Sequence, residues 1–554
     1  MKRYNFYLHC FKLIFVLTAN SIFLTCTNKP TLTAKLWEPI QFDISINQSP
    51  KNTYWDVPIS ALFFHEKDTI KINGFWFNKD TAKIRFTPTK TGSWQYRILK
   101  KSSVIKQGII EVKPTNKNNH GFVRRDKRYP YHFVFDDGTR YFMFGTTYYN
   151  MVLNACAGDR WKTAIDSALV FGINKIRVFA NSSKSLKTPY PDIQPFLKTS
   201  DSIDYNQLNP EYWKALDRIV EYSLRKGMVI DLIMLGYGAE TYATEEQDKN
   251  YIRYLLARYA AYPNIIWCLT NEWNYIYRDY GRGKPFWNSI GEIVRTEDPY
   301  MKHNGQLRPL SIHQQTRVDF QFFNYDWPVH AIVQLGVRNG QGTVKDEWDD
   351  SDPEFKSATK FGDEWGNYSI IYNLGHNMPV VNDEFGYIGE PLDKSEATNN
   401  DRSTWPAFTR EKHRNVMWGI VLGGGYGSTG DKNKYTDGHP YFSANWHSDP
   451  EEYKDIKVLV DFFTSGEIEY WKMFCANNII TQGNRVYALC EPGKQYLFYS
   501  ALGNEFRAEI EPGNYKVKLI NPVTGEQVQQ KQFNGKEFEL CFNNKLDWIV
   551  YLTK

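Results

Sequence analysis

Residues 264–273 read Asn-Ile-Ile-Trp-Cys-Leu-Thr-Asn-Glu-Trp. The part up to Leu269 is apolar and rich in β-branched and aromatic side chains, which is typical of a strand buried on both faces. The run then changes abruptly to the polar residues Thr270, Asn271 and Glu272. In parallel sheets, the side chains that carry chemistry gather where buried strands end. The stretch therefore predicts an α/β fold with a polar site at the carboxyl edge of its sheet.

Strands and amphipathic helices alternate on both sides of this stretch, over residues 120–466. The expected strands are Arg140–Thr147, Ile173–Phe179, Val229–Ile233, Asn264–Leu269, Leu310–His313, Phe320–Tyr325, Pro379–Glu384 and Val416–Gly423, although the first half of the last segment could also finish a helix. About eight such units predict a (β/α)₈ TIM barrel. A doubly wound open sheet is the alternative, but no G-x-G-x-x-G motif opens any of the helices.

Short alternating strands with turn residues flank the predicted barrel. Residues 34–114 contain runs such as Ile40–Ile44 and Gly92–Ile98, and residues 468–554 contain Gln495–Tyr499 and Tyr515–Ile520. Closely spaced strands of this kind predict an antiparallel β-sandwich domain on each side of the barrel.

Residues 1–26 have the features of an export signal. Lys2 and Arg3 precede the mostly apolar segment Leu13–Leu24, which is too short to span a bilayer comfortably. Cys26 follows Phe23-Leu24-Thr25, which resembles a bacterial lipoprotein box with two unusual residues. We expect an exported lipoprotein of the cell surface, outer membrane or periplasm, which meets the membrane through Cys26. Plain secretion is the alternative.

Composition and charge bear on which partners, metals and cofactors the protein can be expected to bind. The formal net charge is +5, and the basic leader contributes much of it, so the rest of the chain is close to neutral and no nucleic-acid partner is expected. Aromatic residues make up 16% of the chain, which suits either sugar stacking or large β-rich cores. The seven cysteines are too widely spaced to suggest a zinc site or a disulfide scaffold. We expect no metal and no cofactor.

Two glutamates follow expected buried strands. Glu272 follows the fourth strand, and Glu384 follows Val380 and Val381 in the seventh. The ends of barrel strands meet at one face, so both carboxyl groups are expected there. If the register of the seventh strand is shifted by one residue, Asp383 points into the barrel instead. Two carboxyl groups about 5 Å apart are what the retaining hydrolysis of a glycosidic bond requires.

Asn271-Glu272-Trp273, together with Glu384, resembles the clan A glycoside hydrolases, over about residues 121–466. The resemblance implies that Glu272 is the acid/base and Glu384 the nucleophile. It also implies supporting roles at the ends of other strands: Asn271 for the sugar 2-hydroxyl, Arg177 and Tyr325 beside the nucleophile, and His313 as a further candidate. Substrate stacking or plain packing is expected of Tyr148, Tyr149, Trp273, Trp327 and Trp446.

The flanking domains also resemble known pieces. Trp37-Glu38-Pro39 and Gly92-Ser93-Trp94 resemble a β-sandwich of unassigned function that precedes such barrels in bacterial polysaccharide-degrading proteins. The tail, with Asp547-Trp548, resembles a sandwich sometimes called a candidate collagen-binding domain.

The sequence therefore predicts a retaining glycoside hydrolase that cleaves a poly- or oligosaccharide by double displacement. One alternative is a non-catalytic carbohydrate-binding lipoprotein that uses the same barrel for capture. Another is an inverting hydrolase, which would need carboxyl groups roughly 6.5–9.5 Å apart.

Overall fold

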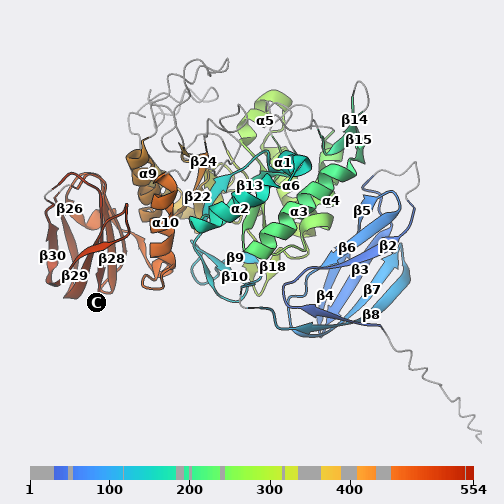
Figure 1. Cartoon of the computed structure of the whole chain (residues 1–554), viewed down its shortest axis with the longest axis horizontal. Helices are drawn as coiled ribbons and strands as arrows, with labels where there is room; N and C mark the ends of the chain where they lie inside the picture. Colours follow the sequence, from blue (N-terminus) through green and yellow to red (C-terminus); the bar gives the residue numbers. More distant parts are fainter. Residues whose placement is uncertain are drawn as a thin grey trace, which may run out of the picture.

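The computed structural model of the chain describes residues 30–47, 54–116, 118–181, 193–198, 202–236, 244–314, 319–334, 363–388, 409–431, 451–503, 505–542 and 544–554. A β-rich N-terminal part and a β-rich C-terminal part lie on opposite sides of a central α/β part (Figure 1). The predicted leader, with Cys26, lies outside the described residues.

Eight parallel strands form the central sheet. They are β12 (Phe144–Thr147), β13 (Lys175–Phe179), β16 (Val229–Leu235), β17 (Ile265–Thr270), β20 (Leu310–Ser311), β21 (Ala331–Val333), β22 (Val380–Asn382) and β24 (Tyr426–Asp431), with the short β23 (Tyr387–Ile388) beside β24. Their order is β20-β17-β16-β13-β12-β24-β22-β21. The two end strands approach each other where the Val329 N–H donates to the Leu310 carbonyl at 2.8 Å. The sheet therefore has the barrel arrangement that the sequence predicts.

Helices cover the outside of this sheet (Figure 1). They are α1 (Met151–Ala157), α2 (Arg160–Val170), α3 (Pro210–Lys226), α4 (Glu245–Tyr259), α5 (Trp273–Tyr280), α6 (Lys284–Glu297), α8 (Asp363–Ile371), α9 (Arg410–Leu422) and α10 (Glu451–Thr464). The ends of α3 follow from its sequence, since the Asn209 side chain accepts from the Glu211 N–H and Gly227 closes the helix at φ 78°. None of the helices in the described ranges has the length and hydrophobicity that a membrane crossing needs.

The predicted sixth strand, Phe320–Tyr325, is wrong. This segment is a turn in which the Tyr325 N–H donates to the Phe322 carbonyl at 3.1 Å, and the sixth strand is β21. Its aromatic side chains pack against one another, with the Phe322 and Tyr325 rings 5.6 Å apart. Aromatic residues favour strands because strands bury them, and this turn also buries two of them, Phe320 and Phe322.

The predicted eighth strand, Val416–Gly423, is also wrong, because Val416–Leu422 belongs to helix α9 and the eighth strand is β24. All the α9 residues from His413 to Leu422 are buried. A helix buried on every side has no amphipathic period, so its sequence cannot be told from that of a buried strand.

The N-terminal part consists of two facing sheets. The first has the order β1-β8-β7-β3-β4 and the second β2-β6-β5. The strands are β1 (Thr31–Lys35), β2 (Ile40–Ser45), β3 (Ile59–His65), β4 (Asp68–Asn73), β5 (Phe75–Asn78), β6 (Thr81–Phe86), β7 (Gly92–Lys100) and β8 (Ser103–Lys113), antiparallel except that β1 runs parallel to β8. Phe63 from the first sheet stacks on Phe86 from the second at 3.8 Å between ring centroids. This part is therefore a β-sandwich.

The C-terminal part is one antiparallel sheet of seven strands. They are β25 (Phe474–Cys475), β26 (Ile480–Gln482), β27 (Val486–Glu491), β28 (Gln495–Ser500), β29 (Phe506–Ile520), β30 (Gln527–Leu540) and β31 (Trp548–Thr553). The register of the long β29–β30 pair shifts between Glu509 and Gly513, and the sheet encloses a core of its own that includes Phe498 and Phe538.

Smaller sheets accompany these parts. Below the barrel lie β9 (Val123–Arg125), β10 (Phe133–Phe135) and β11 (Arg140–Tyr141), and two hairpins are formed by β14 (Phe196–Lys198) with β15 (Ile203–Leu208) and by β18 (Lys302–His303) with β19 (Gln306–Leu307).

A buried ion-pair cluster joins the N-terminal sandwich to the barrel. Arg85 on β6 binds both carboxylate oxygens of Asp217 on α3, at 3.1 and 2.7 Å. Arg258 on α4 binds the same carboxylate at 3.0 and 2.7 Å. Burial alone would raise the pKa of Asp217, but Arg258 and Arg85 outweigh it and hold the pKa below its ordinary value. The carboxylate therefore links the two parts as an ion.

We expect Asp217→Asn to lower the free energy of unfolding by about 3–5 kcal/mol, because it leaves two buried guanidinium groups without their counter-ion. The wild-type contribution is present above pH 3.8, the ordinary pKa of the group, and is lost as the pH falls below it. Urea denaturation at neutral and acid pH measures both effects. Glu211→Gln, which breaks an exposed pair with Lys214, is the matched control with an expected loss below about 1 kcal/mol. Equal losses in the two variants would contradict the assignment.

The C-terminal part docks on helices α9 and α10 (Figure 1). Arg414 on α9 donates to both carboxylate oxygens of Asp547, at 2.6 and 2.8 Å. Next to this pair, the Trp418 and Tyr499 rings stack at 5.4 Å between centroids. Both flanking parts are thus fixed to the barrel by buried, hydrogen-bonded charges.

Candidate active site

Glu272 lies at the carboxyl end of β17 in a sharp turn. Its backbone is left-handed, with φ 46° and ψ 58°, which is uncommon for a residue with a side chain. The flanking backbone is bonded to the end of β20, since the His313 N–H donates to the Thr270 carbonyl at 3.1 Å and the Trp273 N–H donates to the His313 carbonyl at 3.0 Å. These bonds hold Glu272 at the rim, where it is half-buried.

Glu384 lies just past the carboxyl end of β22, on the same face of the barrel. The Asp383 N–H donates to the Val333 carbonyl at 2.9 Å, and the Phe385 N–H donates to the Ser428 carbonyl at 3.2 Å. The backbone of Glu384 is thus fixed between the ends of β21 and β24. Its side chain is 6% exposed.

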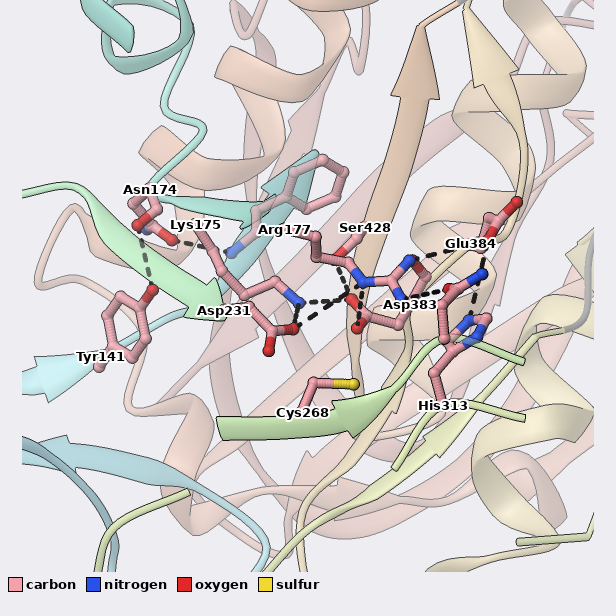
Figure 2. A network of polar contacts seen from close by, with 12 residues as sticks. Tyr141, Asn174, Lys175, Arg177, Asp231, Cys268, His313, Asp383, Glu384 and Ser428 are labelled. Atoms are coloured by element: carbon pink, nitrogen blue, oxygen red, sulfur yellow. Dashed lines mark hydrogen bonds and ion pairs between the residues drawn. The ribbon is translucent and has the colours of Figure 1, made fainter. Parts of the chain in front are cut away.

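Three side chains, one from the middle of β13 and two from just past the ends of β12 and β20, surround the Glu384 carboxylate. Its Oε2 atom is 3.4 Å from the Tyr149 hydroxyl, 3.7 Å from Arg177 Nη1 and 3.8 Å from His313 Nε2. Figure 2 shows Arg177 and His313 pointing toward this carboxylate from different strands. A hydroxyl, a guanidinium group and an imidazole together stabilise the ionised form of the carboxyl group.

His313 also contacts Glu272. Its Nδ1 atom is 3.2 Å from the Glu272 backbone nitrogen and must accept that N–H. A neutral imidazole that accepts at Nδ1 carries its proton on Nε2, so the N–H faces Glu384. One histidine therefore joins the backbone of the first glutamate to the carboxylate of the second.

Asn271 is oriented by two donors. Its Oδ1 atom accepts from Arg177 Nη2 at 2.8 Å and from the Tyr149 hydroxyl at 3.1 Å. These bonds fix which end of the amide is oxygen. The Nδ2 end makes no hydrogen bond to any residue in the described ranges. It is therefore available to donate to a ligand, as the resemblance implies for a sugar hydroxyl.

Tyr149 follows β12, and its ring stacks on Phe179 at 4.5 Å between centroids. Burial raises the pKa of Tyr149 well above its ordinary value; Arg177 acts against this effect, and the negative charges of Glu384 and Glu272 add to it. The hydroxyl thus stays protonated, and its single proton can be donated either to Asn271 Oδ1 at 3.1 Å or to Glu384 Oε2 at 3.4 Å. Both glutamates act on the same phenol, which is consistent with their location at one site.

The structure brings together most of the residues that the sequence indicated: Glu272, Glu384, Asn271, Arg177 and His313. Tyr325 is not among them. Its described contacts are with Phe322, and the hydroxyl beside Glu384 comes from Tyr149 instead. The expected place of Tyr325 is therefore corrected, because it depended on a sixth strand that is a turn.

The expected stacking residues lie in different surroundings. Tyr148 is 2% exposed, and its hydroxyl accepts from Asn154 on α1 at 2.8 Å. Trp273 is 5% exposed and packs edge-on against Phe322 at 5.3 Å. Trp327 is fully buried. These rings face other side chains, and Trp446 lies outside the described residues.

Sequence reasoning treated Tyr149 only as a stacking or packing ring, and it missed Lys175 and Asp231. A signal for the last two was present. Lys175 and Arg177 are two residues apart and therefore lie on the same face of β13, and Asp231 interrupts the apolar run of β16. A charged residue inside a buried strand calls for a partner, because an unpaired charge there is very costly.

Among the residues that the structure describes, no group of three His, Cys, Asp or Glu side chains at the two glutamates is close enough to share a metal ion. Over the residues that the structure describes, the group of three acidic or cysteine side chains close enough to share an ion is Glu505, Glu539 and Cys541, which is exposed in the C-terminal part. The five described cysteines are free thiols.

Comparison with protein families gives two matches. A family described as "Apiosidase-like, catalytic domain" matches residues 127–448, more than half of the chain. A domain of unknown function, DUF5060, matches residues 33–101. A search of curated proteins finds no match.

Solved structures share the fold at low sequence identity. A candidate glycoside hydrolase from Bacteroides vulgatus ATCC 8482 is 20% identical, with a TM-score of 0.73 over 94% of this chain and 99% of that chain. A family 5 glycoside hydrolase from the same organism is 15% identical, with a TM-score of 0.59 over 78% of this chain and 94% of that chain. The first of these likenesses spans nearly the whole chain, including both flanking parts.

Proposed function

Because this chain belongs to the family of apiosidase-like catalytic domains, we propose that it is a retaining glycoside hydrolase with Glu384 as nucleophile and Glu272 as acid/base. It cleaves an O-glycosidic bond of a poly- or oligosaccharide by double displacement.

The observation that carries the proposal is the joint environment of the two glutamates. Glu384 has a hydroxyl, a guanidinium group and an imidazole around one carboxylate oxygen, all three from other strands. Such surroundings suit a group that must be ionised at the start of the reaction. Glu272 lies at the same rim, where its backbone N–H donates to His313 and the residue is half-buried, whereas Glu384 is buried. Two carboxyl groups in different surroundings suit two different roles.

In the first step, Glu384 attacks the anomeric carbon while Glu272 gives its proton to the leaving oxygen. The bond between the anomeric carbon and that oxygen breaks, and a glycosyl ester forms on Glu384. The Asn271 Nδ2 group donates to a sugar hydroxyl and so orients the ring. Arg177, Tyr149 and His313 fix the attacking oxygen and limit its movement, which lowers the entropic part of the barrier.

In the second step, water attacks the same carbon from the face that the leaving group vacated. Glu272, now ionised, takes a proton from that water, and Glu384 leaves as a carboxylate. Two inversions give net retention of the anomeric configuration. The Tyr149 hydroxyl and the His313 N–H then stabilise the returning negative charge on Glu384.

The substrate is proposed to be a plant or algal polysaccharide, or an oligosaccharide derived from one. The family name makes a glycoside of apiose, a branched pentose, the first compound to try. We further propose that the protein is exported and reaches the cell surface or periplasm as a lipoprotein through Cys26. The basic residues Lys2 and Arg3, with the apolar segment Leu13–Leu24, support this proposal.

The proposal predicts that the purified protein releases sugar from at least one member of a polysaccharide panel that includes apiose-containing glycans. Proton NMR at early times should show that the first released anomer has the configuration of the substrate. The Glu384→Ala and Glu272→Gln variants, assayed in parallel, guard against a contaminating enzyme. Release of the opposite anomer would mean an inverting mechanism, and binding without release would mean a capture protein; either result would overturn the proposal.

A further inference from the structure

Two buried cations and two buried aspartates occupy the inside of the barrel next to Glu384. They are Lys175 and Arg177 on β13, Asp231 on β16, and Asp383 after β22, and none is more than 1% exposed. Figure 2 shows them as one connected network that leads to Glu384. Burying four charges is costly, so their arrangement requires an explanation.

The contacts form a chain that starts at Lys175. Its ammonium group binds Asp383 Oδ1 and lies 3.3 Å from Asp231 Oδ2. The other oxygen of Asp383, Oδ2, is 3.1 Å from Arg177 Nε. The Nη atoms of Arg177 are thus left to bind Asn271 and Tyr149 and to face Glu384.

The backbone of β12 leaves space for the Lys175 side chain and its contacts. A Cβ atom on Gly145 of β12 would lie 2.5 Å from Lys175 Cε and would also collide with Ser428. The Ser428 hydroxyl donates to Asp383 Oδ1. The missing side chain at Gly145 therefore makes room for the lysine and for the serine that binds the same aspartate.

Asp383 also limits how closely Arg177 binds the nucleophile. Arg177 is 3.1 Å from Asp383 Oδ2 but 3.7 Å from Glu384 Oε2. A two-point ion pair between Arg177 and Glu384 would stabilise the carboxylate and weaken its attack. The attraction between Asp383 and the Nε side of the guanidinium group opposes a rotation that would form such a pair.

We propose that Lys175 and Asp383 are positioning residues of this site. Lys175 anchors Asp383, and Asp383 sets the rotation of Arg177, so that its two Nη groups orient Asn271, Tyr149 and Glu384. Neither residue touches the substrate. The inference deepens the proposed function and rests on it.

Lys175→Met keeps the length of the side chain and removes its charge. We expect kcat to fall by roughly 10²-fold with little change in KM, because the reacting groups lose their alignment while binding contacts remain. The acid limb of the pH dependence of kcat/KM should move to higher pH, because Lys175 binds Asp383 and Asp231 and its loss makes the network that reaches Glu384 more negative. The other charged or titratable groups that face this network are Arg177, Tyr149, His313 and His330. A purely structural lysine would not move that limb.

Lys175→Met can also destabilise the fold, because it leaves Asp231 and Asp383 with one cation fewer. The double variant Lys175→Met with Asp231→Asn restores the balance of buried charge, so its melting temperature should return toward that of the wild type. Its kcat should stay low, because Asp383 still lacks its anchor. Gly145→Ala, which displaces Lys175 and leaves every charge in place, should lower kcat in the same way.

Asp217→Asn is the matched control, since it removes a buried charge between the sandwich and the barrel, far from this network in the fold. It should lower the melting temperature and leave kcat and the pH profile unchanged. A double variant whose kcat returns to the wild-type level would overturn the inference. If that result is obtained while Glu384→Ala and Glu272→Gln are inactive, only the positioning roles of Lys175 and Asp383 are refuted. If Glu384→Ala and Glu272→Gln both retain activity, the proposed function itself is refuted.

Discussion

Glu384→Ala is expected to lower kcat by at least ~10⁴-fold, because the substitution removes the atom that attacks the anomeric carbon. The protein should still fold. Arg177, which loses Glu384 as a neighbour, keeps Asp383 at 3.1 Å and Asn271 at 2.8 Å. The melting temperature should therefore stay near that of the wild type, and initial rates on the substrate found in the panel measure the loss.

The matched control for this variant is Glu211→Ala, which removes an exposed glutamate from the first turn of α3 and should keep full activity. Rescue of the Glu384→Ala variant by added azide gives a second test of the nucleophile. In Glu384→Ala the anion can enter the space of the lost carboxylate and attack the anomeric carbon itself, giving a glycosyl azide of inverted configuration. Activity near the wild-type level without azide would mean that another group attacks the sugar.

The second large effect is expected for Glu272→Gln, which keeps the shape of the side chain and removes its exchangeable proton. For a substrate with a poor leaving group, kcat/KM should fall by about 10²–10⁴-fold, the usual contribution of a general acid. An aryl glycoside with an acidic phenol needs no protonation, so its first step should proceed nearly as in the wild type.

The difference between the two leaving groups identifies the role of Glu272, because a structural carboxylate would affect both substrates alike. The second step still lacks its base in this variant, so the glycosyl ester should accumulate. Azide, which needs no base, should accelerate its breakdown. Equal losses on both substrates would contradict the acid/base assignment.

The strand ends that carry the site could be predicted because each has a simple local signature. In β17 and β22 a β-branched run is followed by polar residues, and this pattern identified Glu272 and Glu384. Arg177 on β13 was implied by the resemblance to the clan A glycoside hydrolases. The parallel arrangement of the barrel then brings the ends together without any further information from the sequence.

Two strands could not be predicted because their local sequences fit two structures equally well. The aromatic run Phe320–Tyr325 forms a turn that buries Phe320 and Phe322, and Val416–Leu422 is buried as a helix. In both cases burial explains the hydrophobicity, and packing against the rest of the barrel decides the backbone.

The roles of individual polar groups depend on geometry that a sequence does not contain. The sequence left open whether Glu384 or its neighbour Asp383 points into the barrel. In the structure, Asp383 points inward toward Lys175, while Glu384 reaches Tyr149 and His313. The two acids take different positions, one inside the barrel and one at the rim. Which of the side chains of Asp383 and Glu384 points inward is decided by how β13 and β22 run in three dimensions.

The central claim is that Glu384 forms a covalent bond to the sugar. A substrate analogue with fluorine at C2 and a good leaving group slows the breakdown of such an ester more than its formation, so the ester can be trapped at acid pH. Mass spectrometry of the digested protein should then find one glycosyl unit on the peptide that contains Glu384, and none in Glu384→Ala. A sugar attached to Asp383, Glu272 or any other residue would contradict the account.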